Sequence, residues 1–283
     1  MRTFSRRWRL MKIGIIGTGH MGGMLARAFA ETSSECVYVY NRTAEKAEAV
    51  AADFTNMAVC NTWRSLVSCV DAVILCTKAA DGFHMMQQLG PALSRNQLLL
   101  TTISSIDLDQ WQEFTPATPV KLIPSLTQTV HKGALLVSYP RTISPEDKLR
   151  LEQKLSAIGR PYVIDEAQVR VCSDLTSCGP AFLTSICQSW AQAAAQTGNI
   201  DRAEAESLLA SMITGLAALL EAGMTFEQVI DQIRVPGGVT ELGLEALGDG
   251  PLQLFTRLHA ETARYANGHK RNSVPSPLAS RQV

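Results

Sequence analysis

Short runs of apolar residues recur along the first part of the chain. They are rich in Val, Ile and Leu and too short for buried helices, which is typical of strands buried on both faces. These runs stand at 12–16, 36–40, 58–60, 71–76, 98–102, 120–123, 134–138 and 162–164. Apolar residues at helical spacing lie between them after Met21 and at 44–52, 62–67, 83–89 and 146–158. The alternation predicts an α/β fold, a Rossmann-like doubly wound and largely parallel sheet.

The pattern changes at Glu166. Beyond it strand signals nearly vanish, and Ala, Leu, Ile and Met dominate. Helices are expected at 178–197, 202–221, 226–233, 241–247 and 252–266. The helix at 202–221 is apolar over a wide face, so it must be enclosed by its own domain or by a partner chain. Because this half is small, we expect an all-α dimerisation domain that forms a homodimer or higher homo-oligomer.

These patterns divide the chain into domains. We expect an NAD(P)-binding Rossmann domain at 11–165 and an all-helical dimerisation and substrate domain at 166–268, with residues 1–10 and 269–283 disordered. The first ten residues carry four arginines but lack the apolar core of a signal peptide. No apolar run long enough to cross a bilayer stands out.

A glycine-rich turn follows the first apolar run directly. Gly17-Thr18-Gly19-His20-Met21-Gly22 has the pattern G-x-G-x-x-G and opens a helical segment. In a dinucleotide-binding unit, the first glycine makes the turn, the second lets backbone N–H groups approach a pyrophosphate, and the third lets the helix pack on the sheet. The helix N-terminus adds unpaired donors. All six residues are therefore predicted to bind the cofactor, and an ordinary tight turn is the alternative.

The end of the second strand predicts which dinucleotide binds. An NAD enzyme usually has Asp or Glu there, whereas this chain has Asn41-Arg42-Thr43. A guanidinium with amide and hydroxyl donors suits the 2′-phosphate of NADPH, with NADH still possible. Alternatively, Arg42 is solvated and Thr43 caps the next helix. Ligands bind beyond the carboxyl ends of parallel strands, so Thr77, Lys78 and Ser125 are further candidate cofactor contacts, with a solvated loop lysine as the alternative for Lys78.

Composition limits the functions open to the chain. Its 283 residues carry 26 basic and 26 acidic side chains, which leaves no basic field for nucleic acid and no basic face for a membrane surface. Seven cysteines without C-x-x-C spacing fit buried thiols in a reducing cytoplasm better than disulfides or a metal site. We expect a cytoplasmic protein without metal.

Two loops in the helical half contain unusual glycines. Gly179-Pro180 starts one helix, and Pro236-Gly237-Gly238-Val239-Thr240 opens another. Backbone donors exposed at a helix N-terminus suit a substrate carboxylate, although both loops could be plain turns between helices.

These motifs resemble the pyrroline-5-carboxylate reductase family from Met11 to about Ala266. Three of the family's motifs occur here in the same order: Asn-Arg-Ser/Thr as residues 41–43, Gly-Pro-Ala-aromatic as 179–182, and Pro-Gly-Gly-x-Thr as 236–240. The resemblance implies NAD(P)H-dependent reduction of the C=N bond of 1-pyrroline-5-carboxylate to L-proline. It also implies that helical domains interlock between subunits.

The resemblance further implies roles for single residues. Gly237, Gly238 and Val239 would bind the substrate carboxylate through backbone donors, and Thr240 would be catalytic, holding the proton at the ring nitrogen. Cys178 would be a further substrate-binding residue. Since hydride transfer belongs to the cofactor, neither a nucleophile nor a metal is implied.

Several positions depart from the family pattern. Val235 replaces a serine, Ser125 an asparagine, Cys178 a serine and Ala79 a proline. Losing a polar partner in a dry site costs about 1–3 kcal/mol. The departures resemble the late-competence ComER-like branch of the family, which has Ile-Pro-Ser and Ser-Cys-Gly-Pro-Ala-Phe. Two alternatives therefore stand beside proline synthesis: reduction of another small imine or carbonyl acid, and a catalytically weak, nucleotide-binding regulatory protein.

Overall fold

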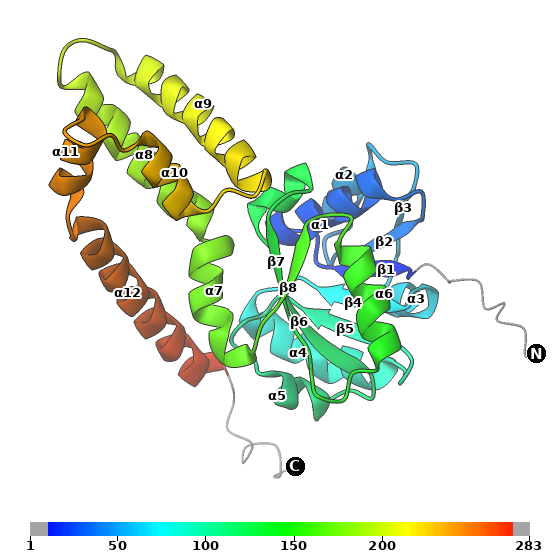
Figure 1. Cartoon of the computed structure of the whole chain (residues 1–283). Coiled ribbons are helices and arrows are strands. Elements are labelled where there is room, and N and C mark those ends of the chain that lie inside the picture. Colours follow the sequence, from blue (N-terminus) through cyan, green and yellow to red (C-terminus); the bar gives the residue numbers. More distant parts are fainter. Residues whose placement is uncertain (1–10, 274–283) are drawn as a thin grey trace, which may run out of the picture. The chain divides into compact units, whose positions relative to one another are not determined.

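A computed structural model describes residues 11–273 of the chain (Figure 1). The chain forms two compact units. One contains the chain up to Cys178 together with the segment from Thr262 onward, and the other is Gly179–Glu261. The predicted domain boundary at 165/166 lies earlier than this division, because the segment that follows it packs with the sheet.

The first unit is built on one eight-stranded sheet. Its order is β3-β2-β1-β4-β5-β6-β7-β8, and β6 and β7 pair antiparallel while the other neighbours are parallel. The strands are β1 (Ile13–Ile16), β2 (Val37–Tyr40), β3 (Met57–Val59), β4 (Ala72–Leu75), β5 (Leu98–Thr101), β6 (Thr118–Ile123), β7 (Ala134–Ser138) and β8 (Arg160–Val163). Ile15 pairs with Val39 on one side and Ile74 on the other, so the strand order reverses at β1. The predicted doubly wound fold is confirmed.

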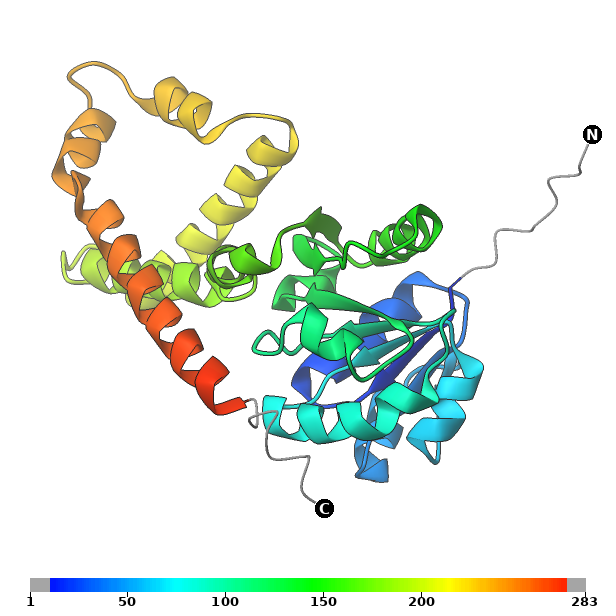
Figure 2. The same ribbon diagram turned by 90° about the horizontal axis from the view of Figure 1, so that it is seen from below.

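Helices cover both faces of this sheet (Figures 1 and 2). They are α1 (His20–Thr32), α2 (Ala44–Ala51) and α6 (Pro145–Leu155) on one face, and α3 (Trp63–Cys69), α4 (Ala79–Leu89) and α5 (Leu108–Gln112) on the other. Phe29 and Leu151 are fully buried against the first face, and Trp111 against the second. Successive strand residues therefore point into two different apolar cores. Because both faces of the sheet are buried, the strands are continuous apolar runs in the sequence.

Local signals fix several helix starts. Thr62 accepts from Ser65 N and forms a capping box at the start of α3. Ser144 caps α6, which has Pro145 at its first position. Thr43 occupies the N-cap position of α2 without a side-chain hydrogen bond.

Short elements also occur that the pattern did not predict. They are the helices α5 and α7 (Val169–Thr176) and the 3₁₀ turns η1 (Gly90–Ala92), η2 (Leu126–Val130) and η3 (Glu166–Gln168). Helix α7 buries Val169, Ser173 and Asp174. Because two of these three buried residues are polar, α7 lacks the apolar periodicity that predicts a helix.

The second unit is helical throughout. It contains α8 (Gly179–Ala195), α9 (Arg202–Glu221), α10 (Phe226–Ile233), α11 (Val239–Leu247) and the first part of α12 (Gly250–Ser273). Helices α8 and α9 pack against each other, and each buries one residue, Ala191 in α8 and Ala205 in α9. Helices α10 and α11 bury none of their residues, and Phe226 is 72% exposed. Exposed apolar side chains in such a number are typical of a surface that another protein covers.

Helix α9 has the predicted bounds and a notable composition. By length and hydropathy it could cross a membrane, with a mean hydropathy of 1.4, and 6% of that stretch is buried in this chain. A helix that a second subunit encloses has the same composition.

Helix α12 is longer than predicted. It continues to Ser273, so the expectation of disorder from 269 is wrong for 269–273. The helix passes through Gly268 without ending, although an interior glycine costs about 1 kcal/mol relative to alanine. The remaining predicted disorder, at 1–10 and 274–283, lies outside the described residues.

Candidate functional site

The glycine turn lies at the carboxyl ends of β1 and β4, where the strand order reverses. Gly17 has φ +94°, and a Cβ there would lie 2.4 Å from the Cys76 carbonyl oxygen. A Cβ on Gly22 would lie 1.8 Å from the Gly17 carbonyl oxygen. Gly19 differs, because a Cβ there would meet nothing within 4 Å. The first and third glycines are thus required by the fold, whereas the second faces open space.

The space in front of Gly19 suits an anion. Gly19 is the N-cap of α1 and provides no side-chain cap, and no acidic residue lies in the first turn. Among the described residues, the Thr18 and Thr77 hydroxyls are buried without a hydrogen-bond partner in the protein. Thr77 lies beside the turn, since its Cγ2 is 3.4 Å from a Cβ built on Gly17. A dinucleotide pyrophosphate fits this donor set.

Asn41 connects the glycine turn to the end of β2. Its Oδ1 accepts from Thr18 N at 3.0 Å, and its Nδ2 donates to the Thr43 carbonyl oxygen at 3.0 Å. Both ends of the amide are therefore engaged within the protein. Arg42 and Thr43 are exposed at the same strand end. Asn41 accordingly positions the loop, while Arg42 and Thr43 are the residues free to meet a 2′-phosphate.

The other predicted cofactor contacts differ in their surroundings. Lys78 is exposed at the N-cap of α4, next to Thr77. Ser125 is 1% exposed, and its hydroxyl donates to the Thr176 carbonyl oxygen at 3.0 Å. Its hydroxyl therefore joins the start of η2 to the end of α7 and has no proton left to donate to a cofactor.

Cys76 forms the floor of the turn. A Cβ on Gly22 would lie 3.0 Å from the Cys76 Cβ. Burial raises the pKa of the Cys76 thiol to about 12, against a smaller lowering by a hydrogen bond with Thr102. A neutral thiol therefore lines the turn, which adds no negative charge beside the pyrophosphate site.

A polar cluster surrounds Cys178 within the first unit. The Asp174 side chain is almost fully buried, and Oδ1 lies 2.5 Å from an Arg170 guanidinium nitrogen. Thr262 Oγ1 donates to Asp174 Oδ2 at 2.5 Å. The same Arg170 nitrogen lies 3.4 Å from Cys178 Sγ. Cys178, predicted to bind substrate, is thus held where the chain leaves the first unit, and Thr262 marks where it returns.

Sequence reasoning missed Arg170, Asp174 and Thr262. The first two are four residues apart on α7, a spacing that allows an ion pair, but the helix itself was not predicted. Thr262 lies 88 residues further along, and no local signal connects it to Asp174.

Lys121 is a second buried charge that the sequence did not single out. It is 1% exposed in β6, and Nζ lies 2.5 Å from Glu166 Oε1, 3.4 Å from the Ser104 carbonyl oxygen and 4.0 Å from Asp107 Oδ1. Glu166 Oε1 also accepts from Leu108 N at 2.9 Å. This network fixes the loop after β5 to the segment that leads into α7. The available signal was a lysine between the apolar residues Val120 and Leu122 of the strand.

The predicted substrate loop lies in the second unit. Gly237 has φ +72°, and Gly238 N donates to the Val235 carbonyl oxygen at 2.8 Å, which with Pro236 is typical of a type II turn. Gly237 N donates to Glu241 Oε2 at 2.7 Å. Val239 is 88% exposed, and Thr240 is half-buried at the start of α11. Two of the three predicted backbone donors are therefore engaged inside the loop, and Val239 N remains at the uncapped end of the helix.

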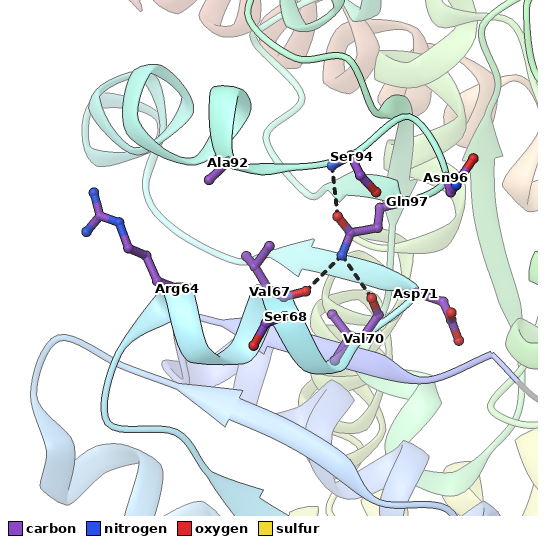
Figure 3. Close-up of a pocket in the computed structure, with 9 residues that line it drawn as sticks. All are labelled: Arg64, Val67, Ser68, Val70, Asp71, Ala92, Ser94, Asn96 and Gln97. Atoms are coloured by element: carbon purple, nitrogen blue, oxygen red, sulfur yellow. Dashed lines mark hydrogen bonds between the residues drawn. The ribbon is translucent and has the colours of Figure 1, made fainter.

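A hollow of about 540 Å³ lies at the amino ends of the strands, away from the glycine turn (Figure 3). Gln97 spans it: Nε2 donates to the carbonyl oxygens of Val67 and Val70 at 2.8 and 2.9 Å, and Oε1 accepts from Ser94 N at 2.9 Å. These bonds satisfy the carboxyl end of α3, so Gln97 has a structural role.

Two family models match the chain. Residues 12–105 match the family described as NADP oxidoreductase, coenzyme F420-dependent, and residues 166–267 match pyrroline-5-carboxylate reductase dimerisation. The cofactor is therefore NADP, as predicted.

Curated relatives and solved structures agree with these matches. ComE operon protein 4 of Bacillus subtilis is 29% identical over 89% of this chain and 94% of that protein. Pyrroline-5-carboxylate reductase 3 of Bacillus subtilis is 26% identical over the same shares. The structure of a pyrroline-5-carboxylate reductase from Coxiella burnetii has a TM-score of 0.80 at 20% identity and covers 94% of this chain and 100% of that one. The Plasmodium falciparum enzyme with NADP bound has a TM-score of 0.75 at 19% identity, covering 93% and 98%.

Proposed function

We propose that the chain is a pyrroline-5-carboxylate reductase-like, NADP-dependent oxidoreductase that reduces 1-pyrroline-5-carboxylate to L-proline, a proposal that the two family matches, the curated relatives and the fold support. The observation that carries the proposal is the pair of sites in one chain. A glycine turn with open space at Gly19 and unpartnered hydroxyls fits NADPH, and a glycine loop opens α11 before Thr240.

The residues divide the work. NADPH supplies the hydride when it is bound. Gly19 and the N-terminus of α1 receive the pyrophosphate, and Arg42 with Thr43 receives the 2′-phosphate. The Thr240 hydroxyl donates a hydrogen bond to the imine nitrogen, which makes the adjacent carbon more electrophilic as the hydride arrives and the nitrogen gains a proton. Val239 N receives the substrate carboxylate at the uncapped start of α11.

The helical half supports assembly as a homodimer. Its family model is a dimerisation model, and α10 and α11 leave Phe226, Ile230, Ile233 and Leu242 exposed in the single chain. A second copy of the same half would cover these side chains. Cytoplasmic location stays a prediction from the sequence.

A steady-state assay with 1-pyrroline-5-carboxylate tests the function. NADPH oxidation is measured for the wild type and for Thr240→Ala, and L-proline formation is followed in parallel. We expect turnover in the wild type and a loss of about tenfold or more in kcat for Thr240→Ala, because general-acid assistance contributes at least that much. Equal turnover in both proteins would remove Thr240 from the mechanism.

A regulatory function is the second candidate, and the substrate loop favours it. Gly237 N and Gly238 N are engaged within the loop, and Val235 has no hydroxyl. Under this alternative, the protein binds NADPH with ordinary affinity and turns over no imine. Calorimetric NADPH binding together with absent turnover would select it.

A further inference from the structure

The loop with the predicted substrate donors also carries a carboxylate of its own. Glu241 is the third residue of α11, and its side chain reaches back past the start of the helix. Its Oε2 accepts from Gly237 N at 2.7 Å. An N–H group expected to bind the acid group of a substrate is therefore already bound to an acid group of the protein.

We infer that Glu241 is a resident competitor for the substrate carboxylate, and that it sets the preference between carboxylate-bearing and carboxylate-free cyclic imines. This inference rests on the proposed function. It makes Glu241 a residue that determines specificity, in addition to the motif residues 236–240.

The charges around the loop support this inference. A substrate acid at Val239 N would lie near the Glu241 carboxylate, and two like charges this close repel each other. The adjacent cation does not offset the repulsion, since the Arg234 guanidinium is paired with Asp231 at 3.0 Å. A protonated imine nitrogen is attracted by the same carboxylate. Glu241 thus weakens binding at the acid end of a substrate and strengthens it at the nitrogen end.

The flanking side chains act in the same direction. Val235 and Val239 are 62% and 88% exposed, and neither has a donor that could replace the engaged Gly237 N–H. A carboxylate-bearing ligand must therefore displace Glu241 from Gly237 N or bind through fewer donors. An imine without a carboxylate needs neither to displace Glu241 nor to give up a hydrogen bond.

Steady-state kinetics with two substrates tests the inference. 1-Pyrroline-5-carboxylate and 1-pyrroline, which lacks the acid group, are compared at saturating NADPH for wild type, Glu241→Gln and Glu241→Ala. The matched control is Glu245→Gln, an exposed glutamate one turn further along α11. We expect the ratio of kcat/KM for the acid substrate over 1-pyrroline to rise about tenfold or more in both Glu241 variants, as for one charge-assisted hydrogen bond. It should stay within about twofold in the control. An unchanged ratio in both Glu241 variants would overturn the inference.

Calorimetry separates this inference from the proposed function. L-Proline and pyrrolidine are titrated into the NADP⁺-loaded wild type and Glu241→Gln. If no imine is reduced by any protein, the proposed function fails, while tighter binding of L-proline to Glu241→Gln with no gain for pyrrolidine still supports the role of Glu241. Equal L-proline affinities, or no binding of either ligand to either protein, would contradict that role.

Discussion

Replacing Gly19 with alanine should separate cofactor binding from folding. Gly19 has φ −70° and ψ −164°, a conformation that alanine adopts without strain. A Cβ there meets no protein atom within 4 Å. The folded state therefore accepts the methyl group, and the unfolded chain loses conformational freedom. Alanine is a poorer N-cap than glycine, which opposes this gain, so we expect the free energy of unfolding to stay within about 1 kcal/mol of the wild type.

The cofactor should not accept the same methyl group. The space in front of Gly19 is where we place the pyrophosphate, which must approach the backbone N–H groups closely. A hydrogen bond to a charged group contributes about 1.5–3 kcal/mol, so losing one weakens binding about 10- to 100-fold. We expect the Kd of NADPH to rise by at least about tenfold in Gly19→Ala.

Two measurements and one control decide the matter. NADPH affinity is measured by calorimetry, and stability by chemical denaturation without the cofactor. The control is Gly22→Ala, whose Cβ would lie 1.8 Å from the Gly17 carbonyl oxygen, so both stability and binding should fall. Wild-type NADPH affinity in Gly19→Ala would refute our placement of the pyrophosphate. A loss of stability clearly larger than about 1 kcal/mol in Gly19→Ala would refute the view that Gly19 faces open space.

Three further outcomes follow from the structure. Arg42→Ala should weaken NADPH at least about tenfold more than NADH in parallel titrations, since only NADPH carries the 2′-phosphate; equal losses would contradict the role of Arg42. Thr262→Val should lower the free energy of unfolding by about 1–3 kcal/mol, because the buried Asp174 carboxylate loses a hydrogen-bond donor. Thr262→Ser keeps the hydroxyl and should retain most of the wild-type stability. Equal denaturation midpoints for the two variants would contradict this role of the Thr262 hydroxyl. The raised pKa of Cys76, about 12 against an ordinary 9.0, means that the folded state keeps a proton that the unfolded chain releases. The stability that the neutral thiol contributes is complete below pH 9 and declines as pH rises toward 12. Between pH 8 and pH 10.5, the free energy of unfolding should therefore decrease less in Cys76→Ala than in the wild type, as measured by chemical denaturation. Equal decreases in the two proteins would be evidence against a buried neutral thiol.

Local signals were sufficient for the nucleotide-binding unit. The glycine turn and the strands around it depend on neighbours in the sequence, and the structure confirms these elements. Helices α9 and α10 have the predicted bounds, because their composition and capping residues are also local. The sequence therefore predicted the doubly wound sheet and the helical half that follows it.

The candidate site was less accessible to sequence reasoning where its bonds join distant residues. Ser125 was predicted to contact the cofactor, but its hydroxyl is used by Thr176, 51 residues away. Asp174 and Thr262 are 88 residues apart. The loss of free donors at Gly237 depends on the side-chain rotamer of Glu241, which residue spacing does not specify. The sequence identified the motif residues, but it did not indicate whether their hydrogen-bond donors were already engaged within the protein.

Cofactor binding and turnover should depend differently on assembly. The nucleotide-binding unit buries Phe29, Leu151 and Trp111 in cores of its own, whereas α10 and α11 bury nothing in the single chain. The loop before Thr240 belongs to that poorly buried half, so we expect its geometry to depend on a partner subunit. On dilution below the dissociation constant of the oligomer, reductase activity should fall while the Kd of NADPH stays constant. Light scattering, kinetics and NADPH titration over the same concentration range measure this, and a fully active monomer would show that the helical half supports its own loop.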